Sequence, residues 1–84
     1  MALYFLEYDL RKQRDYQKLY DELARFDAVR VLKSLWCFKR FNTTSEALRN
    51  HFSQFIDVDD GLIVAEGTDN WASIRTEGHP NQLK

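Results

Sequence analysis

The sequence is poor in the residues that mark several classes of small protein. Its 84 residues contain one cysteine, one proline and three glycines. A single cysteine excludes an internal disulfide and a cysteine-based zinc site, and so few glycines exclude a glycine-rich phosphate loop. Because Cys37 lies inside an apolar run, we expect it to be a buried core thiol.

Long hydrophobic runs and a basic N-terminal segment are also missing. No apolar stretch approaches the roughly 20 residues that span a bilayer. The first four residues, Met1 to Tyr4, contain no lysine or arginine, whereas a signal peptide begins with a basic region. The sequence therefore predicts a cytoplasmic protein with no membrane segment.

The charges nearly cancel, and the net charge of −1 argues against a broadly basic surface for nucleic acid. Their distribution is uneven, however. Residues 1–45 carry nine Lys/Arg against six Asp/Glu, and residues 46–84 carry three against seven. Any polyanion would bind the N-terminal half. The simpler explanation of this uneven charge distribution is that the charged residues lie on ordinary solvated surfaces.

What the chain does contain is enough apolar material for one core. Hydrophobic residues make up 44% and aromatic residues 14% of the sequence, which disfavours disorder. Patterning predicts a single domain over residues 1–75 and a loose polar tail over residues 76–84. A chain this short buries only roughly 60–65% of its unfolded surface, and self-association is a common remedy.

Strand and helix patterns alternate along this domain. Asp15 can cap a first helix, and Thr43 with Glu46 forms a capping box for a second. The first helix has an apolar stripe at Tyr16, Leu19, Tyr20, Leu23 and Phe26, and the second has one at Leu48, Phe52, Phe55 and Ile56. Apolar strand patterns cover residues 3–9, 28–33, 35–41 and 62–66, with a short extra strand expected at 71–74.

The order β-α-β-β-α-β predicts an α+β, ferredoxin-like fold, with an antiparallel sheet and two helices on one face. Alternation places Leu3 and Phe5 on one side of the first strand and Tyr4 and Leu6 on the other. Both sides are apolar, and the helices suffice for only one. We therefore expect a homodimer through the open face; the residues expected at its interface are Phe5, Trp36 and Trp71.

Three acidic residues in apolar strands are candidate metal ligands: Glu7, Asp9 and Glu66. A carboxylate there costs desolvation energy unless it is paired or coordinated. Glu7 and Asp9 share a face by alternation, and the last strand of this fold lies beside the first, so we expect Glu66 to approach them. Such a cluster suits Mg²⁺ or Mn²⁺. The simpler alternative is that Glu7 pairs with a basic residue and Asp9 only ends the strand.

Polar and basic residues expected near Asp9 are candidate phosphate-binding groups, although short basic clusters usually lie in solvated loops. Phosphate contacts by such side chains dominate nucleic-acid affinity. The set consists of Arg11, Lys12, Arg14, Lys33 and Ser34.

Other functional residue types give weaker indications. His51 has no second ligand at metal-binding spacing, and a surface helix histidine is a commoner reading than a proton donor. Tyr8, Trp36 and Trp71 could stack on bases, but such residues more often lie in a core or a dimer interface.

The stretch Leu3-Tyr4-Phe5-Leu6-Glu7-Tyr8-Asp9-Leu10 resembles the opening strand of the small CRISPR-associated Cas-two family, which ends in Tyr-Asp followed by an aliphatic residue. Val29 to Trp36 resembles the paired strands of that family, and the turn Ile56 to Gly61 fits the segment before its last strand. The resemblance covers about residues 2–75. Three features depart from the family: the slightly negative charge, Glu7 where an apolar residue is expected, and a tail from Thr76 to Lys84 that is too short and polar for a large docking surface.

The resemblance implies a symmetric dimer in which Asp9 of both chains meets at a cleft, with the segment near Trp71 adding a strand to the neighbouring sheet. In this family the matching aspartate is proposed to bind a divalent metal for ribonuclease or deoxyribonuclease activity. Other members act as non-catalytic bridges between integrase dimers on DNA. A toxin branch, virulence-associated protein D, shares the fold and cleaves RNA.

Three functional hypotheses follow, of which the third is a regulatory module whose open sheet face binds a protein or small molecule. The first is a homodimeric, metal-dependent endonuclease for RNA or DNA, with Asp9 catalytic and Glu7 or Glu66 assisting. The second is a non-catalytic dimeric adaptor that binds nucleic acid or a protein partner in a CRISPR, phage or toxin–antitoxin setting. Near-neutral charge favours the second and third over a purely electrostatic nucleic-acid binder.

Overall fold

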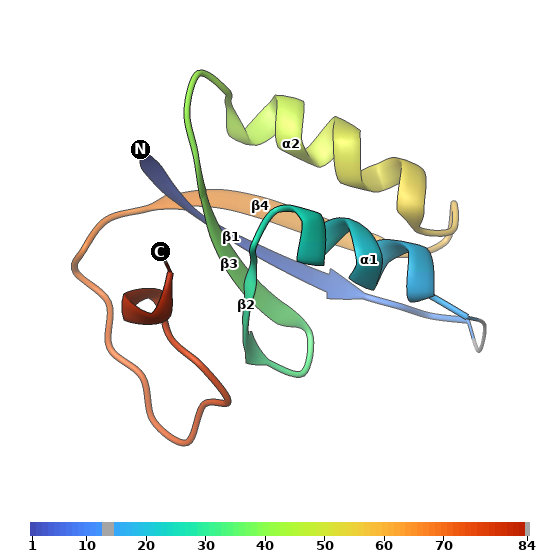
Figure 1. Ribbon diagram of the computed structural model, residues 1–84. Helices are drawn as coiled ribbons and strands as arrows, with labels where there is room; N and C mark the ends of the chain where they lie inside the picture. Colours follow the sequence, from blue (N-terminus) through green and yellow to red (C-terminus); the bar gives the residue numbers. More distant parts are fainter. Residues whose placement is uncertain (13–14, 84) are drawn as a thin grey trace.

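The fold is built on a four-stranded antiparallel sheet, seen in a computed structural model that describes residues 1–12 and 15–83 (Figure 1). The strands lie in the order β2-β3-β1-β4, so the two strands of the β2-β3 hairpin are followed by the first and the last strand. This arrangement confirms the predicted ferredoxin-like α+β fold. The strand bounds are β1 Ala2–Asp9, β2 Val29–Leu32, β3 Leu35–Arg40 and β4 Gly61–Gly67.

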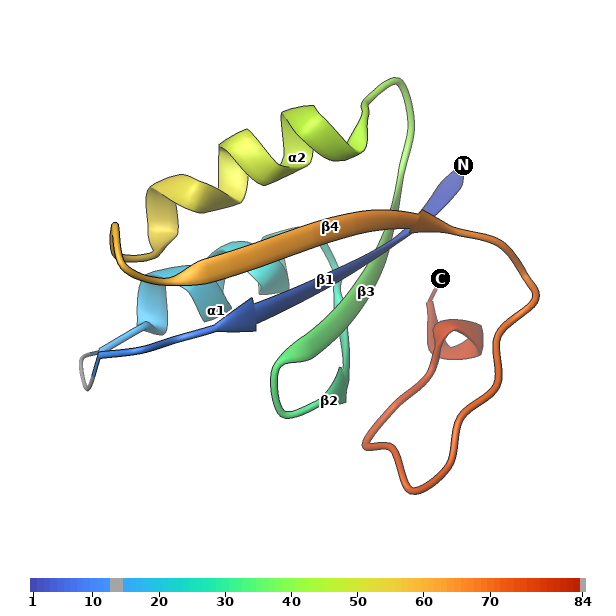
Figure 2. The same cartoon turned by 180° about the vertical axis from the view of Figure 1, so that it is seen from behind.

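Two helices, α1 Gln17–Arg25 and α2 Ser45–Phe52, cover the same face of this sheet (Figures 1 and 2). Asp15, the predicted cap of the first helix, accepts a hydrogen bond from the Gln17 N–H at 2.9 Å, but the N-cap residue is Tyr16, whose side chain makes no capping hydrogen bond. At the second helix the cap is Thr44 rather than the predicted Thr43, and its Oγ1 accepts from the Ala47 N–H at 3.1 Å. A 3₁₀ turn, Ser53–Phe55, continues α2.

Aromatic rings dominate the core between the helices and the sheet. Phe38 of β3 is fully buried, and its ring lies 5.2 Å from that of Phe26, 5.8 Å from that of Phe52 and 6.0 Å from that of Tyr4, centroid to centroid. Such aromatic contacts supply large apolar area in little volume. This compensates for the small number of residues available to the core.

The other face of the sheet is covered by the chain's own C-terminal segment, residues 68–83. Leu3, Val31 and Cys37 lie beneath it and are buried, and Trp71 and Leu83 pack against this cluster. Burial raises the pKa of the Cys37 thiol to about 11, although nearby Lys39 acts in the opposite direction. The expectation of a buried core thiol is therefore confirmed.

This covering segment differs from the expectation in two ways. Within the described residues no strand forms at 71–74, and one backbone hydrogen bond joins this segment to the sheet: the Glu77 N–H donates to the Val31 carbonyl at 2.8 Å. The part expected to be a loose tail is docked up to residue 83, with a 3₁₀ turn, Pro80–Gln82, and a buried Pro80. Lys84 lies outside the described residues. Trp71 stacks on His79 with ring centroids 5.6 Å apart, so a few well-placed side chains hold a segment that is mostly polar.

Within the described residues, neither helix combines the length and the apolar character that crossing a membrane requires.

Candidate functional site

Asp9, the predicted catalytic residue, is the last residue of the central strand β1 and lies opposite Gly61 of β4. Its side chain is 71% exposed, and Oδ2 accepts a hydrogen bond from Arg11 Nε at 3.1 Å. The carboxylate is therefore accessible, but its charge is compensated by a neighbour two residues along the chain.

The three predicted metal ligands do not come together in one chain. Glu7 and Asp9 lie on the same face, two residues apart on β1, and line a shallow hollow with Ile63. Glu66, however, lies opposite Tyr4, so it is five residues along the ladder from Asp9 and on the helix-covered face. The expected approach of Glu66 is wrong, and no group of three metal-ligating side chains exists within residues 1–12 and 15–83.

The basic residues after β1 bind the chain's own acidic turn. Arg11 donates from Nη1 to the Asp59 carbonyl at 3.0 Å, and its backbone N–H donates to Asp60 Oδ1 at 2.7 Å. Lys12 pairs with Asp59 at 3.1 Å and with Asp57 at 3.8 Å. Two cations that were expected to bind phosphate are thus neutralised by the turn before β4. Arg14 lies outside the described residues.

Asp60 is the centre of this network, which we call the strand-end corner. Oδ1 accepts from the Arg11 N–H, and Oδ2 accepts from the Asp57 N–H at 2.8 Å and from the Tyr16 hydroxyl at 2.8 Å. Desolvation acts to raise the pKa of Asp60, but the hydrogen bonds from Arg11, Asp57 and Tyr16 outweigh it and leave that pKa lowered. Desolvation, with the bond to Asp60, raises the pKa of Tyr16. The corner ties the end of β1 to the start of β4 and to α1.

This lowered pKa predicts an acid-dependent contribution to stability. Ionised Asp60 stabilises the fold at pH values above its unfolded pKa of about 3.9, and that contribution is lost as pH falls through the lower folded value. Asp60→Asn should therefore lower the urea midpoint at pH 7, and the gap between variant and parent should close towards pH 2. Asp69→Asn, at an exposed position outside the corner, is the control. A gap that stays constant from pH 7 to pH 2 would contradict the assignment.

Lys33 and Ser34 form the β2-β3 turn. The Lys33 carbonyl accepts from the Tyr8 hydroxyl at 3.1 Å and from Arg30 Nη2 at 2.6 Å, and the Ser34 carbonyl accepts from the Tyr8 N–H at 3.2 Å. The backbone of the turn is thus tied to β1 and β2. Lys33 itself is exposed.

An aromatic group lies beside this turn, on the helix-covered face. Trp36 stacks on Tyr20 with centroids 6.3 Å apart, and the Arg30 guanidinium lies 5.1 Å from the Trp36 ring. Trp36 Nε1 donates to the Tyr8 hydroxyl at 3.1 Å. Desolvation raises the pKa of Tyr8, and the bond from Trp36 partly opposes this. Because Arg30 already occupies a ring face, we interpret the group as a support for the hairpin.

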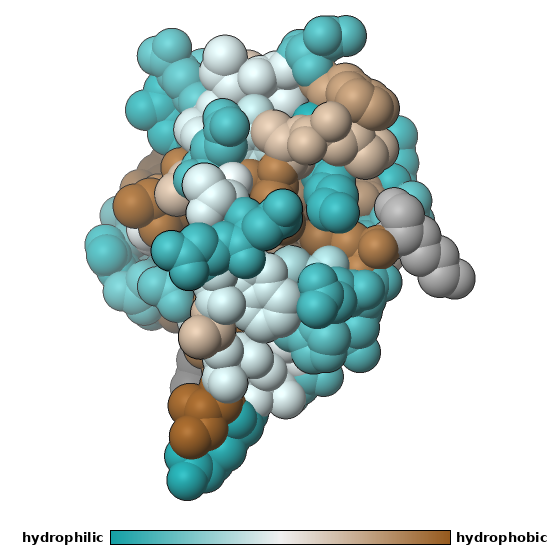
Figure 3. Space-filling view, turned by 90° about the vertical axis from the view of Figure 1, so that its left-hand side faces the viewer, coloured by the Kyte–Doolittle hydropathy of each residue, from teal (hydrophilic) through white to brown (hydrophobic). Residues whose placement is uncertain are grey.

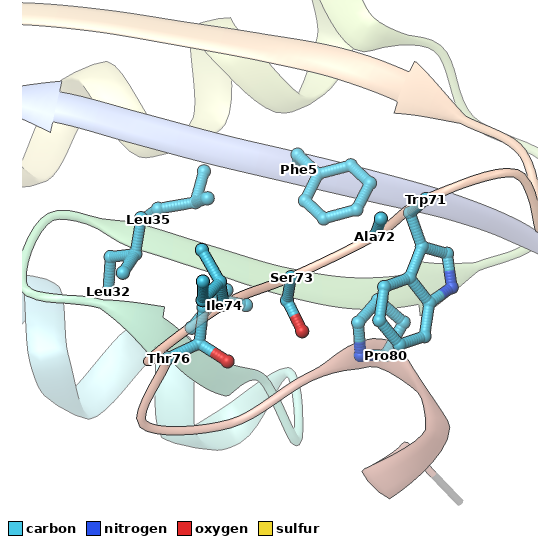
Figure 4. Close-up of a pocket in the computed structure, with 10 residues that line it drawn as sticks. Phe5, Leu32, Leu35, Trp71, Ala72, Ser73, Ile74, Thr76 and Pro80 are labelled. Atoms are coloured by element: carbon cyan, nitrogen blue, oxygen red, sulfur yellow. The ribbon is translucent and has the colours of Figure 1, made fainter.

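The three predicted dimer-interface residues do not share one face. Phe5 pairs with Cys37 and lies on the open face, whereas Trp36 pairs with Leu6 and lies on the helix-covered face. Trp71 belongs to the covering segment and lies beside Pro80 (Figure 4). One flat contact surface therefore cannot include all three residues.

The covering segment also changes the argument for an open, apolar face. Between it and the sheet is a cavity of about 310 Å³, with Phe5 and Leu35 on the sheet side and Trp71 and Ile74 on the other (Figure 4). On the side of the molecule shown in Figure 3, apolar groups are scattered among hydrophilic ones and do not form one continuous apolar face. The prediction that a second copy must cover this sheet face loses its main premise.

One charged cluster was not singled out from the sequence. Glu22 of α1 is buried; His51 Nε2 lies 2.5 Å from its Oε2, and Arg25 Nη1 lies 3.0 Å from its Oε1. His51 is thus engaged with a carboxylate between the helices and does not belong to the strand-end corner. The one signal in the sequence is that Glu22 directly precedes Leu23 of the apolar stripe and lies three residues after Leu19.

Comparisons with known proteins assign no family to this chain. No protein-family model matches the sequence, and no solved structure matches the fold.

Proposed function

We propose that this protein is a homodimeric, non-catalytic adaptor that binds a protein partner. The observation that carries the proposal is the neutralisation at the strand-end corner: Asp9 is paired with Arg11, and Lys12 is paired with Asp59. A metal-dependent nuclease needs free carboxylates, and a phosphate-binding surface needs free cations. The buried Cys37 thiol suits a reducing compartment, so we propose a cytoplasmic setting.

Exposed apolar side chains also support a protein partner. Leu32, Ile63 and Ile74 have exposed fractions of 42%, 63% and 71%, and they lie on three different segments. With a net charge of −1, attraction between partners would rest on these groups rather than on a basic surface. Binding to such a partner should change little between low and high salt, because few counterions are released.

A nuclease assay tests the non-catalytic part of the proposal. Purified protein and Asp9→Asn are incubated with labelled single- and double-stranded RNA and DNA in magnesium, in manganese or with a chelator. We expect no metal-dependent cleavage by either protein. Asp69→Asn is the matched control for a change of charge outside the corner. Cleavage by the parent that is lost in Asp9→Asn and retained in Asp69→Asn would refute the adaptor.

That same outcome would establish the second candidate, a metal-dependent phosphodiesterase of the kind that the Cas-two resemblance implies. One observation favours it: Glu7 and Asp9 are exposed on one face and border the same hollow of about 220 Å³. One chain does not supply the third carboxylate, since Glu66 is on the other face. A Mg²⁺ or Mn²⁺ site would therefore require Asp9 from both copies of a dimer.

A further inference from the structure

The outer edge of β4 is left open by the described part of the chain. β4 is an edge strand next to β1, and no backbone hydrogen bond of residues 61–67 to another described residue is found beyond that pairing. After Gly67 the C-terminal segment turns away and crosses to β2, where Glu77 bonds to Val31 (Figures 1 and 2). One edge of the sheet is thus protected by the chain, and the other presents unpaired N–H and C=O groups.

β4 also lacks the features that usually prevent edge pairing. Its seven residues contain no proline, lysine or arginine, and Glu66 carries the only charge. Ile63 points away from the helices and is 63% exposed. A regular strand with an exposed β-branched residue is a template for another strand.

We propose that a second copy of this chain pairs with β4 in an antiparallel, two-fold symmetric arrangement centred on Val64, which makes one sheet of eight strands. This inference rests on the proposed homodimer and names its interface. A two-fold axis perpendicular to the sheet keeps each side chain on its own face. The axis must then pass between the two copies of one and the same residue, which lie directly opposite each other. Val64 is the middle residue of β4, and this register gives the longest overlap.

Charge complementarity supports this occupant. In the proposed register Leu62 lies opposite Glu66 of the partner subunit. Glu66 is on the helix-covered face, because it pairs with Tyr4, and on that face Leu62 and Arg49 line one hollow of about 260 Å³ between α2 and β4. The partner's Glu66 therefore enters beside Arg49. Arg49 now donates to Asn50 Oδ1 at 2.8 and 3.0 Å and pairs with Glu46 at 3.8 Å, so the partner's Glu66 would compete with exposed contacts within one helix.

The apolar contacts in this register are complementary as well. On the other face Ile63 lies opposite the partner's Ala65, a small residue on which the exposed side chain can pack. On the helix-covered face the two Val64 side chains meet across the axis. Symmetry gives two copies of the Ile63 contact and two of the Arg49 contact.

Analytical ultracentrifugation over a concentration series tests the interface. The parent should show a reversible monomer–dimer equilibrium, and Ile63→Lys should remain monomeric where the parent is dimeric, because a charge at a sheet edge opposes pairing. Ile74→Lys is the matched control, since Ile74 is 71% exposed, against 63% for Ile63, but lies in the covering segment. Circular dichroism confirms that each variant is folded.

Charge reversal tests the register itself. Arg49→Glu and Glu66→Arg should each raise the dimer dissociation constant at least about tenfold, because each homodimer then has two like-charge contacts. Mixing the two single variants should restore dimerisation, since both contacts in the heterodimer are again of opposite sign. If a substitution weakened the dimer only by disturbing the fold of its own subunit, mixing the two variants would not restore dimerisation.

The outcomes separate this interface from the proposed function. A dimer that Ile63→Lys does not weaken, or single charge variants that mixing does not rescue, would overturn the β4 interface and leave the proposed homodimer standing. A parent that is monomeric at every concentration would overturn both. Cleavage in the nuclease assay that depends on Asp9 would refute the adaptor. It would also argue against the β4 interface, because Asp9 lies opposite Gly61 and the proposed register places the Asp9 residues of the two copies at opposite ends of the joined strands.

Discussion

Phe38→Ala should lower the free energy of unfolding by about 3–5 kcal/mol, which is the cost of removing a fully buried phenylalanine and leaving a cavity. Phe38 is fully buried and contacts Tyr4, Phe26 and Phe52. Domains of this size are stable by only about 5–10 kcal/mol, so the variant should melt roughly 15–30 °C below the parent. Calorimetry or urea unfolding measures the difference.

Phe41→Ala is the matched control for this prediction. Phe41 follows β3 directly, has the same side chain and is 63% exposed. Its replacement should change the free energy of unfolding by about 0.5 kcal/mol or less. Equal losses at the two positions would mean that the aromatic cluster is not the core of the fold.

The residues of this cluster were predictable from local patterns. Tyr4 and Leu6 follow from alternation in β1, and Leu19, Leu23 and Phe52 follow from helical stripes; all five are buried in one cluster. Periodicity of this kind depends only on neighbouring residues. The α+β fold and its element order were therefore accessible from the sequence.

Pairing register was not accessible in the same way, and two site residues were misplaced for that reason. Tyr4 pairs with Glu66 and Leu6 pairs with Trp36, which puts Glu66 and Trp36 on the helix-covered face. A shift of one residue would have moved each to the other face. Alternation determines which residues of one strand share a face. Which residue of the neighbouring strand lies opposite each of them depends on the loops and on packing.

Contacts between distant segments explain the other differences. Arg11 and Lys12 form a basic sequence cluster, and Asp59 and Asp60 form an acidic one nearly 50 residues later; only the fold neutralises each with the other. The covering segment has few apolar residues, and those it has, such as Trp71 and Leu83, are irregularly spaced. Neither pattern is periodic. The basic cluster was therefore interpreted as a loop, and the covering segment as a short strand at 71–74 followed by a loose tail.

The largest electrostatic effect is expected between the helices, where His51→Phe should destabilise the protein by about 2–4 kcal/mol. Glu22 is buried, and the substitution removes the hydrogen-bond donor closest to its carboxylate. Phenylalanine keeps a ring of similar shape against Phe26 and Phe55, so lost packing contributes little. Arg25→Ala, which removes the exposed partner of the same carboxylate, should cost less than about 1 kcal/mol.

A second substitution separates the charge from the packing. Glu22→Leu in the His51→Phe background removes the uncompensated carboxylate and supplies an apolar side chain of similar volume, so it should recover most of the lost stability. Glu22→Leu alone leaves His51 without its acceptor, but that imidazole is partly exposed and can be hydrated. The double variant should therefore be more stable than the sum of the single effects predicts. Strict additivity in urea unfolding would show that Glu22 and His51 contribute independently, and the pair would then not be the electrostatic link between α1 and α2.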